Sequence, residues 1–130
     1  MKEEFVLKWV GKAENDLKTA KDELITEEPA TDTICFHAQQ CVDKYLKAFL
    51  VKKGKSFRKT HDIAELIEIC REIDKDFASL YEMKADKLTR YAVEVRYPDD
   101  FYMPTIEEAH EACEIALTVR KFIRSKLGIE

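Results

Sequence analysis

Apolar side chains recur at steps of three and four residues along most of this chain, and charged side chains fall between them. This period is typical of amphipathic helices rather than strands. It predicts five helices, at about residues 2–25, 31–53, 60–73, 79–95 and 105–127. The second segment is apolar on so many sides that we place it at the centre, packed by several others. We therefore predict an all-α fold, a five-helix up-and-down bundle with mostly antiparallel neighbours that forms one domain over residues 1–130.

Residues with good capping chemistry stand at the expected helix ends. The Ser/Thr-x-x-Glu spacing further predicts reciprocal capping boxes, in which each side chain bonds the other residue's backbone. The candidate N-caps are Thr31 or Asp32 for the second helix, Thr60 for the third, Ser79 with Glu82 for the fourth and Thr105 with Glu108 for the fifth, while Gly54 and Gly128 are candidate stops.

Composition and charge narrow the class of protein without naming a ligand. Hydrophobic residues make up 45% of the chain and charged residues 37%, which argues against disorder and against an all-β fold. A net charge of −4 gives no overall attraction to nucleic acid, so such a contact would need a local basic patch. No apolar run approaches the roughly 20 residues of a membrane span. The first residues also lack a secretory-signal pattern, so we expect a cytoplasmic protein with no membrane partner.

Metal and nucleophile chemistry find little support in the sequence. Glu107 and His110 have the spacing of one di-iron ligand pair, but such bundles need two pairs. His37 and Cys41 are at best half a zinc site, and a core or groove-lining role is the simpler interpretation. The four cysteines form no CxxC pair and fall on or beside apolar positions, so we interpret them as small core residues. The sequence predicts no metal, no cofactor and no catalytic nucleophile.

The segment from Arg96 to Pro104 is the first candidate for function. It places an arginine, two carboxylates and three aromatic residues between two helices, where helical scaffolds often carry function. In the structural alternative, Arg96 pairs with Asp99 or Asp100 and caps the preceding helix. In the functional alternative, Arg96 binds a phosphate or carboxylate with both arms of its guanidinium, and Tyr97 and Tyr102 stack on a base.

The loop from Lys52 to His61 is the second candidate, because it concentrates basic residues ahead of the third helix. One alternative is a solvated connection between helices. The other is a phosphate-contacting rim, in which Arg58 and Lys59 supply charge and the helix start supplies free N–H groups. Asp62, in the first turn, partly opposes an anion there.

Three segments in register resemble one known family. Residues 36–48 (FHAQQCVDKYLKA) are similar to the second-helix signature of HEPN domains, and Thr60-His61-Asp62 and Arg96-Tyr97-Pro98-Asp99 follow in the order of that family. The resemblance implies a five-helix bundle, usually a homodimer, often encoded beside a separate nucleotidyltransferase in a toxin–antitoxin-like pair. It also implies RNA as a substrate, because many HEPN proteins are metal-independent ribonucleases with an Arg-x(4–6)-His motif. In some pairs a tyrosine after the motif is modified with AMP, and Tyr102 is its nearest counterpart.

This chain departs from that motif, because no histidine follows Arg96 after four to six intervening residues. Cleavage through the ribose hydroxyl needs a proton acceptor near neutral pH, and histidine is the usual one. We therefore predict a binding module that is not itself catalytic and that holds a nucleotide or RNA or docks a nucleotidyltransferase. Two alternatives remain, namely a ribonuclease in which His61 or His37 replaces the missing histidine, and a purely structural subunit. The predicted ligand-binding residues are Lys44, Tyr45, Arg58, Lys59, His61, Asp62, Arg96, Tyr97, Asp99 and Tyr102.

Overall fold

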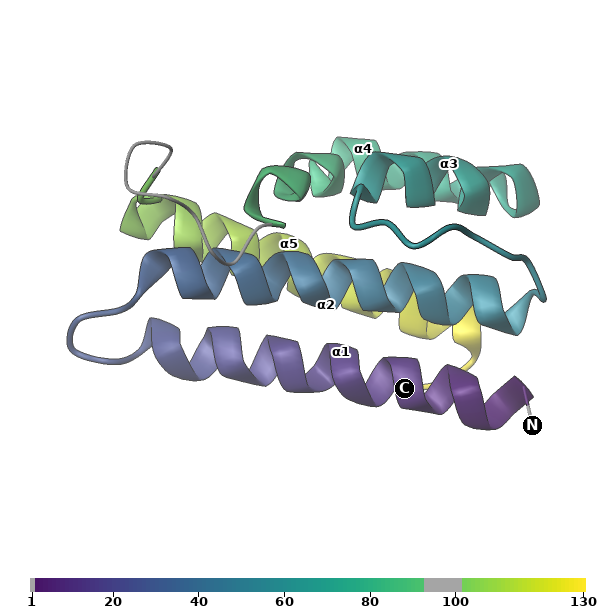
Figure 1. Cartoon of the computed structure of the whole chain (residues 1–130), viewed down its shortest axis with the longest axis horizontal. Coiled ribbons are helices and arrows are strands. Elements are labelled where there is room, and N and C mark those ends of the chain that lie inside the picture. The colour runs from purple at the N-terminus through teal and green to yellow at the C-terminus, as the bar shows by residue number, and fades with distance from the viewer. Residues whose placement is uncertain (1, 93–101) are drawn as a thin grey trace.

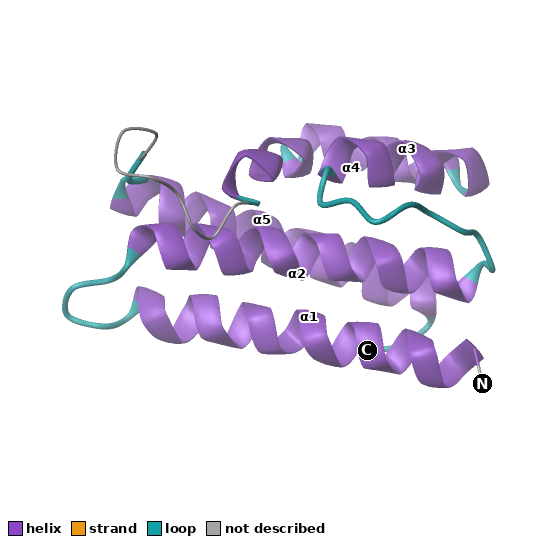
Figure 2. Cartoon of the chain, viewed as in Figure 1, coloured by secondary structure: helices purple, strands orange, loops and turns teal. Residues whose placement is uncertain are grey.

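The computed structural model describes residues 2–92 and 102–130, and all regular structure in these ranges is helical (Figures 1 and 2). The predicted all-α class is therefore confirmed. None of the described helices is both long and apolar enough to cross a membrane. In chain order the elements are α1 (Lys2–Leu24), α2 (Thr31–Lys52), α3 (Ile63–Ile73), the 3₁₀ helix η1 (Lys75–Ala78), α4 (Ser79–Glu82), the 3₁₀ helix η2 (Ala85–Tyr91) and α5 (Ile106–Leu127).

Helix α2 is the central element, as its wide apolar surface predicts. It packs against α1, α3, η2 and α5, and several of its large side chains are fully buried, among them Tyr45, Leu46 and Phe49. Figure 1 shows α1 beside α2, α5 behind them, and α3 with α4 as a further layer. All these elements contribute to one continuous hydrophobic core, so the described residues form a single compact domain.

The helix directions differ from the predicted up-and-down order. Thr31 at the start of α2 donates a 2.7 Å hydrogen bond to the carbonyl of Pro104, just before α5, and Lys52 at the end of α2 donates one of 2.9 Å to the carbonyl of Leu127. The first residues of α2 and α5 therefore lie together, as do their last residues, so the two helices are parallel. The prediction of mostly antiparallel neighbours is wrong here because residues 53–62 run back along α2 before α3 begins (Figure 1).

The predicted fourth helix is broken into short pieces. After η1 and α4, Lys84 takes a left-handed conformation with a φ of 65°, which interrupts the α-helical hydrogen bonding before η2. Phe77 and Leu80 are fully buried, so packing of this irregular segment decides its path more than helix propensity does. Residues 93–95 of the predicted helix lie outside the described residues.

Two predicted stops and one capping box are confirmed. Gly54 and Gly128 have φ values of 68° and 74°, the left-handed conformation that glycine adopts at helix ends. The side chain of Thr105 accepts from the backbone N–H of Glu108, whose carboxylate accepts from the N–H of Thr105. The parallel partner of α2 therefore begins at the predicted residue.

The other predicted caps are wrong, because other residues occupy the N-cap positions. Ala30 occupies the N-cap of α2, and Thr31 bonds to Pro104 instead. Asp62, rather than Thr60, caps α3 by accepting from the N–H of Glu65. The remaining predicted cap, Ser79, donates to the carbonyl of Asp76 and forms no box with Glu82.

All four cysteines are free and buried, which confirms their interpretation as core residues. Burial raises the pKa of the Cys35 and Cys70 thiols to about 12 and that of Cys113 to about 11. Burial also raises the pKa of Cys41. Near neutral pH, each of these four cysteines is therefore almost entirely in the unreactive thiol form.

We expect the folded protein to resist thiol-specific reagents at pH 8. A disulfide reagent that releases a coloured thiolate should titrate close to zero thiols in the native state and four in guanidinium chloride. A thiol that reacts as fast in the native protein as in the unfolded chain would contradict the burial seen here.

Candidate functional site

One side of α2 carries polar side chains along the middle of this otherwise apolar helix. Steps of three and four residues bring them together on a helix surface. We call this side the polar face of α2. It carries the polar residues His37, Gln40, Asp43, Lys44 and Lys47, together with the aromatic residue Phe36. Helix α1 borders this face through Asp16, and the connection between α2 and α3 borders it through His61. The face therefore lies where three segments that are distant in sequence meet.

Asp43 is the most deeply buried charged residue of this face, at 1% exposure. Its Oδ2 lies 2.5 Å from Nδ1 of His61. The ammonium of Lys47 lies 2.8 Å from Oδ1, in ion-pair contact but outside hydrogen-bond geometry. Lys47 is itself buried and lies over the ring of Trp9, 5.6 Å from its centroid. One buried carboxylate thus joins an imidazole and an ammonium.

The contacts of His61 determine how it meets solvent. An ionised carboxylate only accepts hydrogen bonds, so Nδ1 of His61 carries the hydrogen and Nε2 is the nitrogen open to a ligand. The side chain is 58% exposed, although its carboxylate partner is buried. The amide of Gln39 also donates a 2.9 Å hydrogen bond to the backbone carbonyl of His61. Ring and backbone are therefore both held, with one ring nitrogen available.

Asp16 forms a second arrangement of the same kind at the other border. Its Oδ1 lies 2.7 Å from Nδ1 of His37, and its Oδ2 accepts a 2.5 Å hydrogen bond from Lys44. The Asp16 side chain is 9% exposed, and those of His37 and Lys44 are each 22% exposed. The sequence prediction missed Asp16. A usable signal was its position next to Leu17, a residue of the apolar stripe of α1, because a carboxylate at the edge of such a stripe is partly withdrawn from water.

The domain thus holds two buried carboxylates, each paired with an imidazole and an ammonium. Moving a charge out of water is costly, and well-packed apolar residues often stabilise a core as well as a buried ion pair does. Stability alone therefore does not explain both arrangements. Side chains held in fixed positions in this way are candidates for binding a ligand.

Tyr45 lies away from the polar face, inside the bundle. Its hydroxyl donates to Glu14 and accepts a 3.1 Å hydrogen bond from Arg124. Burial, followed by the hydrogen bond to Glu14, raises the pKa of Tyr45 to about 12. Glu14 also accepts a 2.6 Å hydrogen bond from Arg120 of α5. The structure thus places the predicted site residue Tyr45 in a buried network between α1, α2 and α5.

The charge of the predicted basic rim is partly neutralised by Glu65 of α3. Arg58 forms two hydrogen bonds, of 2.8 and 2.6 Å, with the carboxylate of Glu65. Asp62 is engaged as the N-cap of α3. Lys59 is exposed beside them. Arg58, Lys59 and Asp62 are neighbours of His61 in the sequence, and in the structure all three are exposed on the outer surface.

Tyr102 belongs to a separate cluster at the start of α5. Its hydroxyl donates a 2.6 Å hydrogen bond to Glu108, and Arg90 of η2 donates one of 3.2 Å to the same carboxylate. Arg90 also donates to the hydroxyl of Tyr91, at 2.8 Å. Glu108 thereby joins Arg90 of η2 to Tyr102.

Arg96, Tyr97 and Asp99 lie outside the described residues, so their predicted roles stay predictions. The structure does describe η2, the element that precedes them in the chain. The N–H of Ile63, two residues after His61, donates a 2.9 Å hydrogen bond to the side chain of Thr89 in η2. The start of α3 and the 3₁₀ helix η2 are therefore neighbours.

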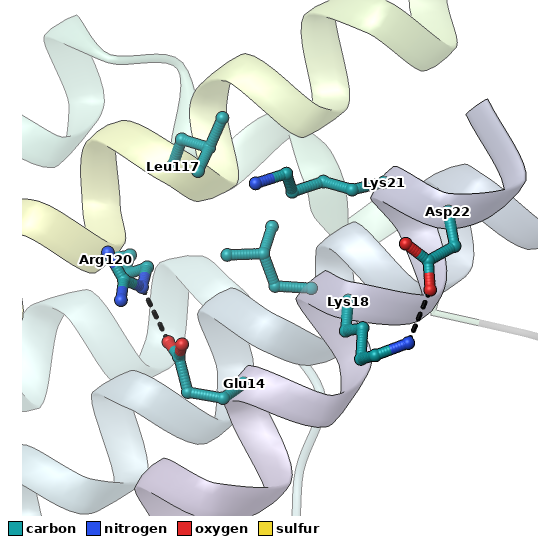
Figure 3. A pocket seen from close by; sticks show the side chains of 7 residues that line it. Glu14, Lys18, Lys21, Asp22, Leu117 and Arg120 are labelled. Carbon is teal, nitrogen blue, oxygen red and sulfur yellow. Dashed lines mark hydrogen bonds and ion pairs between the residues drawn. The ribbon is translucent and has the colours of Figure 1, made fainter. Parts of the chain in front are cut away.

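A pocket of about 260 Å³ lies elsewhere, between α1 and α5 (Figure 3). Its charges are largely paired, because Lys18 contacts Asp22 and Glu14 contacts Arg120, each at 2.6 Å. None of the predicted site residues that the structure describes lines it. In the part of the chain that the structure describes, no group of three His, Cys, Asp or Glu side chains gathers in a way that could hold a metal ion.

These features define a class of small helical domain, in which one central helix presents a polar face between its neighbours. A model of the HEPN domain matches residues 6–126, and the chain belongs to the HEPN family. The crystal structure of ST0689, an archaeal HEPN homologue, is similar with a TM-score of 0.71 and 24% identity, over 93% of this chain and 96% of that one. The crystal structure of TT1696 from Thermus thermophilus is similar with a TM-score of 0.72 and 26% identity, over 93% of this chain and 97% of that one. No curated protein matches.

Removing the Asp43 carboxylate should destabilise the domain strongly, because it leaves the Lys47 ammonium buried without its counter-charge. We expect Asp43→Ala to lower the free energy of unfolding by about 3–5 kcal/mol in urea denaturation. Asp22→Ala, which breaks the exposed pair with Lys18, is the matched control and should change it very little. Equal effects of the two substitutions would contradict this account.

The contact between Tyr102 and Glu108 should be lost in acid. The hydrogen bond from Tyr102, followed by that from the backbone of Thr105, lowers the pKa of Glu108 below its ordinary 4.5. A lowered pKa means that the stabilisation is complete above pH 4.5 and disappears as the pH falls through the folded-state value. The ring signals of Tyr102 in NMR spectra should report this loss. Glu108→Gln should abolish the titration, and Glu107→Gln should leave it intact.

Proposed function

We propose that this protein is a HEPN-type module that binds a nucleotide or nucleic acid and is not itself catalytic. The observation that supports this most directly is the pairing of exposed His61 with buried Asp43. Such an imidazole presents one defined nitrogen to a ligand without needing to reorganise. Gln39 holds the adjacent backbone in the same position.

The surroundings of His61 suit a phosphate-containing ligand. Lys59 and Arg58 stand a few residues before it and would hold phosphate, with Arg58 exchanging its contact to Glu65 for the ligand. Thr89 brings η2 to the start of α3, so we propose that Arg96 of the following segment contributes a second guanidinium. In this proposal Tyr97, Asp99 and Tyr102 contact the base or the partner protein. Lys44 follows Asp43 on the polar face of α2, and the fully buried Tyr45 supports the bundle from inside.

The proposed partner is a separate nucleotidyltransferase, as the family resemblance implies, in a toxin–antitoxin-like pair in the cytoplasm. A homodimer is part of the same proposal. Tyr102 is 52% exposed, which is compatible with its proposed modification by a nucleotidyltransferase. A purely structural role in such a complex predicts complex formation without any binding of nucleotide or RNA.

A ribonuclease is the second candidate, and one observation favours it. Because Nδ1 of His61 bonds to Asp43, Nε2 is oriented to accept a proton from a ribose 2′-hydroxyl, as a general base does. Attack of that oxygen on the adjacent phosphate would form a 2′,3′-cyclic phosphate and release the 5′-oxygen of the next nucleotide. Such an activity would not require a metal ion.

Binding of ATP, GTP and a mixed single-stranded RNA, measured by calorimetry, tests the proposal. We expect His61→Gln and Arg96→Ala each to weaken binding about tenfold or more, equivalent to about 1.4 kcal/mol or more. His110→Gln, on the exposed acidic side of α5, is the matched control and should bind as wild type does. Absence of binding by wild type would refute the binding module.

The same samples distinguish the ribonuclease. Intact RNA after prolonged incubation with EDTA agrees with a binding module. Cleavage that His61→Gln abolishes, and that yields cyclic phosphate ends, would replace the binding module by the ribonuclease.

A further inference from the structure

The polar face of α2 contains a second oriented imidazole that the His61 site does not use. Both oxygens of Asp16 are occupied, one by Nδ1 of His37 and the other by Nζ of Lys44. The carboxylate is buried, while the imidazole and the ammonium are each partly exposed. Asp16 therefore holds the other two side chains in place and is not itself offered to a ligand.

The outward chemistry of this pair is specific. Nδ1 of His37 donates to Asp16, so in the neutral ring Nε2 is an acceptor. The ammonium of Lys44 has three N–H donors, of which Asp16 engages one. An acceptor beside a cationic donor matches a ligand that presents a hydroxyl next to an anionic oxygen. A ribose 2′-hydroxyl and its neighbouring phosphate have this arrangement, whereas deoxyribose lacks the hydroxyl.

This second pair has a carboxylate of its own. Asp16 of α1 holds His37 and Lys44, whereas Asp43 of α2 holds His61 and pairs with Lys47. The ring of Phe36 packs edge-on against His37, with centroids 5.2 Å apart, and adds a partly exposed aromatic surface for a base.

We propose that Asp16, His37 and Lys44 form a second ribonucleotide subsite on the polar face of α2. The ligand of this face is then a single RNA strand of two or more nucleotides, which runs along α2 from His61 to His37, rather than a free nucleotide. Lys44 contacts a phosphate, His37 a 2′-hydroxyl, and Asp16 is a positioning residue. This inference rests on the proposed binding function of the His61 site.

The test compares a mononucleotide with a strand. Binding of AMP, of a fluorescent ribotetranucleotide and of its deoxy counterpart is measured for wild type, Lys44→Met, Lys44→Arg and the control Lys18→Met, which alters the pocket between α1 and α5. We expect the wild type to bind the ribotetranucleotide at least tenfold more tightly than AMP or the deoxy strand. Lys44→Met should remove about tenfold of that advantage, reduce the salt dependence by about 0.7 in log–log slope and leave AMP binding unchanged. Lys44→Arg should largely restore strand binding, and Lys18→Met should behave as wild type.

The outcomes separate this inference from the proposed function. If wild type binds AMP and the strand equally well, the second subsite is refuted while the His61 site stands. If Lys44→Met weakens AMP and strand binding alike, the substitution acts on the fold or on the first site, and the second subsite is again refuted. If wild type binds neither, the proposed function itself fails. A surface that only joins two protein chains predicts this last result.

Discussion

The burial of Asp43 and Asp16 is the constraint on which the polar face of α2 depends. Each carboxylate is almost withdrawn from water and requires partners, and each takes one imidazole and one ammonium. Asp43 thereby attaches the α2–α3 connection to the central helix, and Asp16 attaches α1. The same contacts that hold three segments together also determine which ring nitrogen each histidine presents.

The fold class and the central helix could be predicted because they depend on local period and apolar content. Helix direction could not, because the path of residues 53–62 back along α2 is decided by the contacts of Gln39 and Asp43 with His61, which are distant in sequence. The break in the fourth helix was missed because the helical pattern gives no sign of the left-handed conformation that Lys84 takes, with a φ of 65°.

The candidate site was predictable in part. His61 was recognised from its basic surroundings and its place in the HEPN order, but its carboxylate partner lies 18 residues away. Lys44 and Tyr45 are adjacent in sequence and were assigned together, yet successive helical positions point about 100° apart. One therefore reaches the polar face, whereas the other enters the bundle. Spacing in sequence locates a helix face only when the faces of the neighbouring helices are also known.

The parallel course of α2 and α5 has a practical consequence for experiments on this protein. Together with the antiparallel α1, it places the start of α1 and the end of α5 beside each other, because Lys2 donates to the carbonyl of Lys52 and Lys52 donates to that of Leu127. Tyr102 and Glu108, at the start of α5, are separated from the carboxyl-terminal end of that helix by its full length, about 33 Å for 22 residues. An affinity tag or fluorophore fused to either terminus would leave that far end open, and a second fluorophore there would report partner docking by energy transfer.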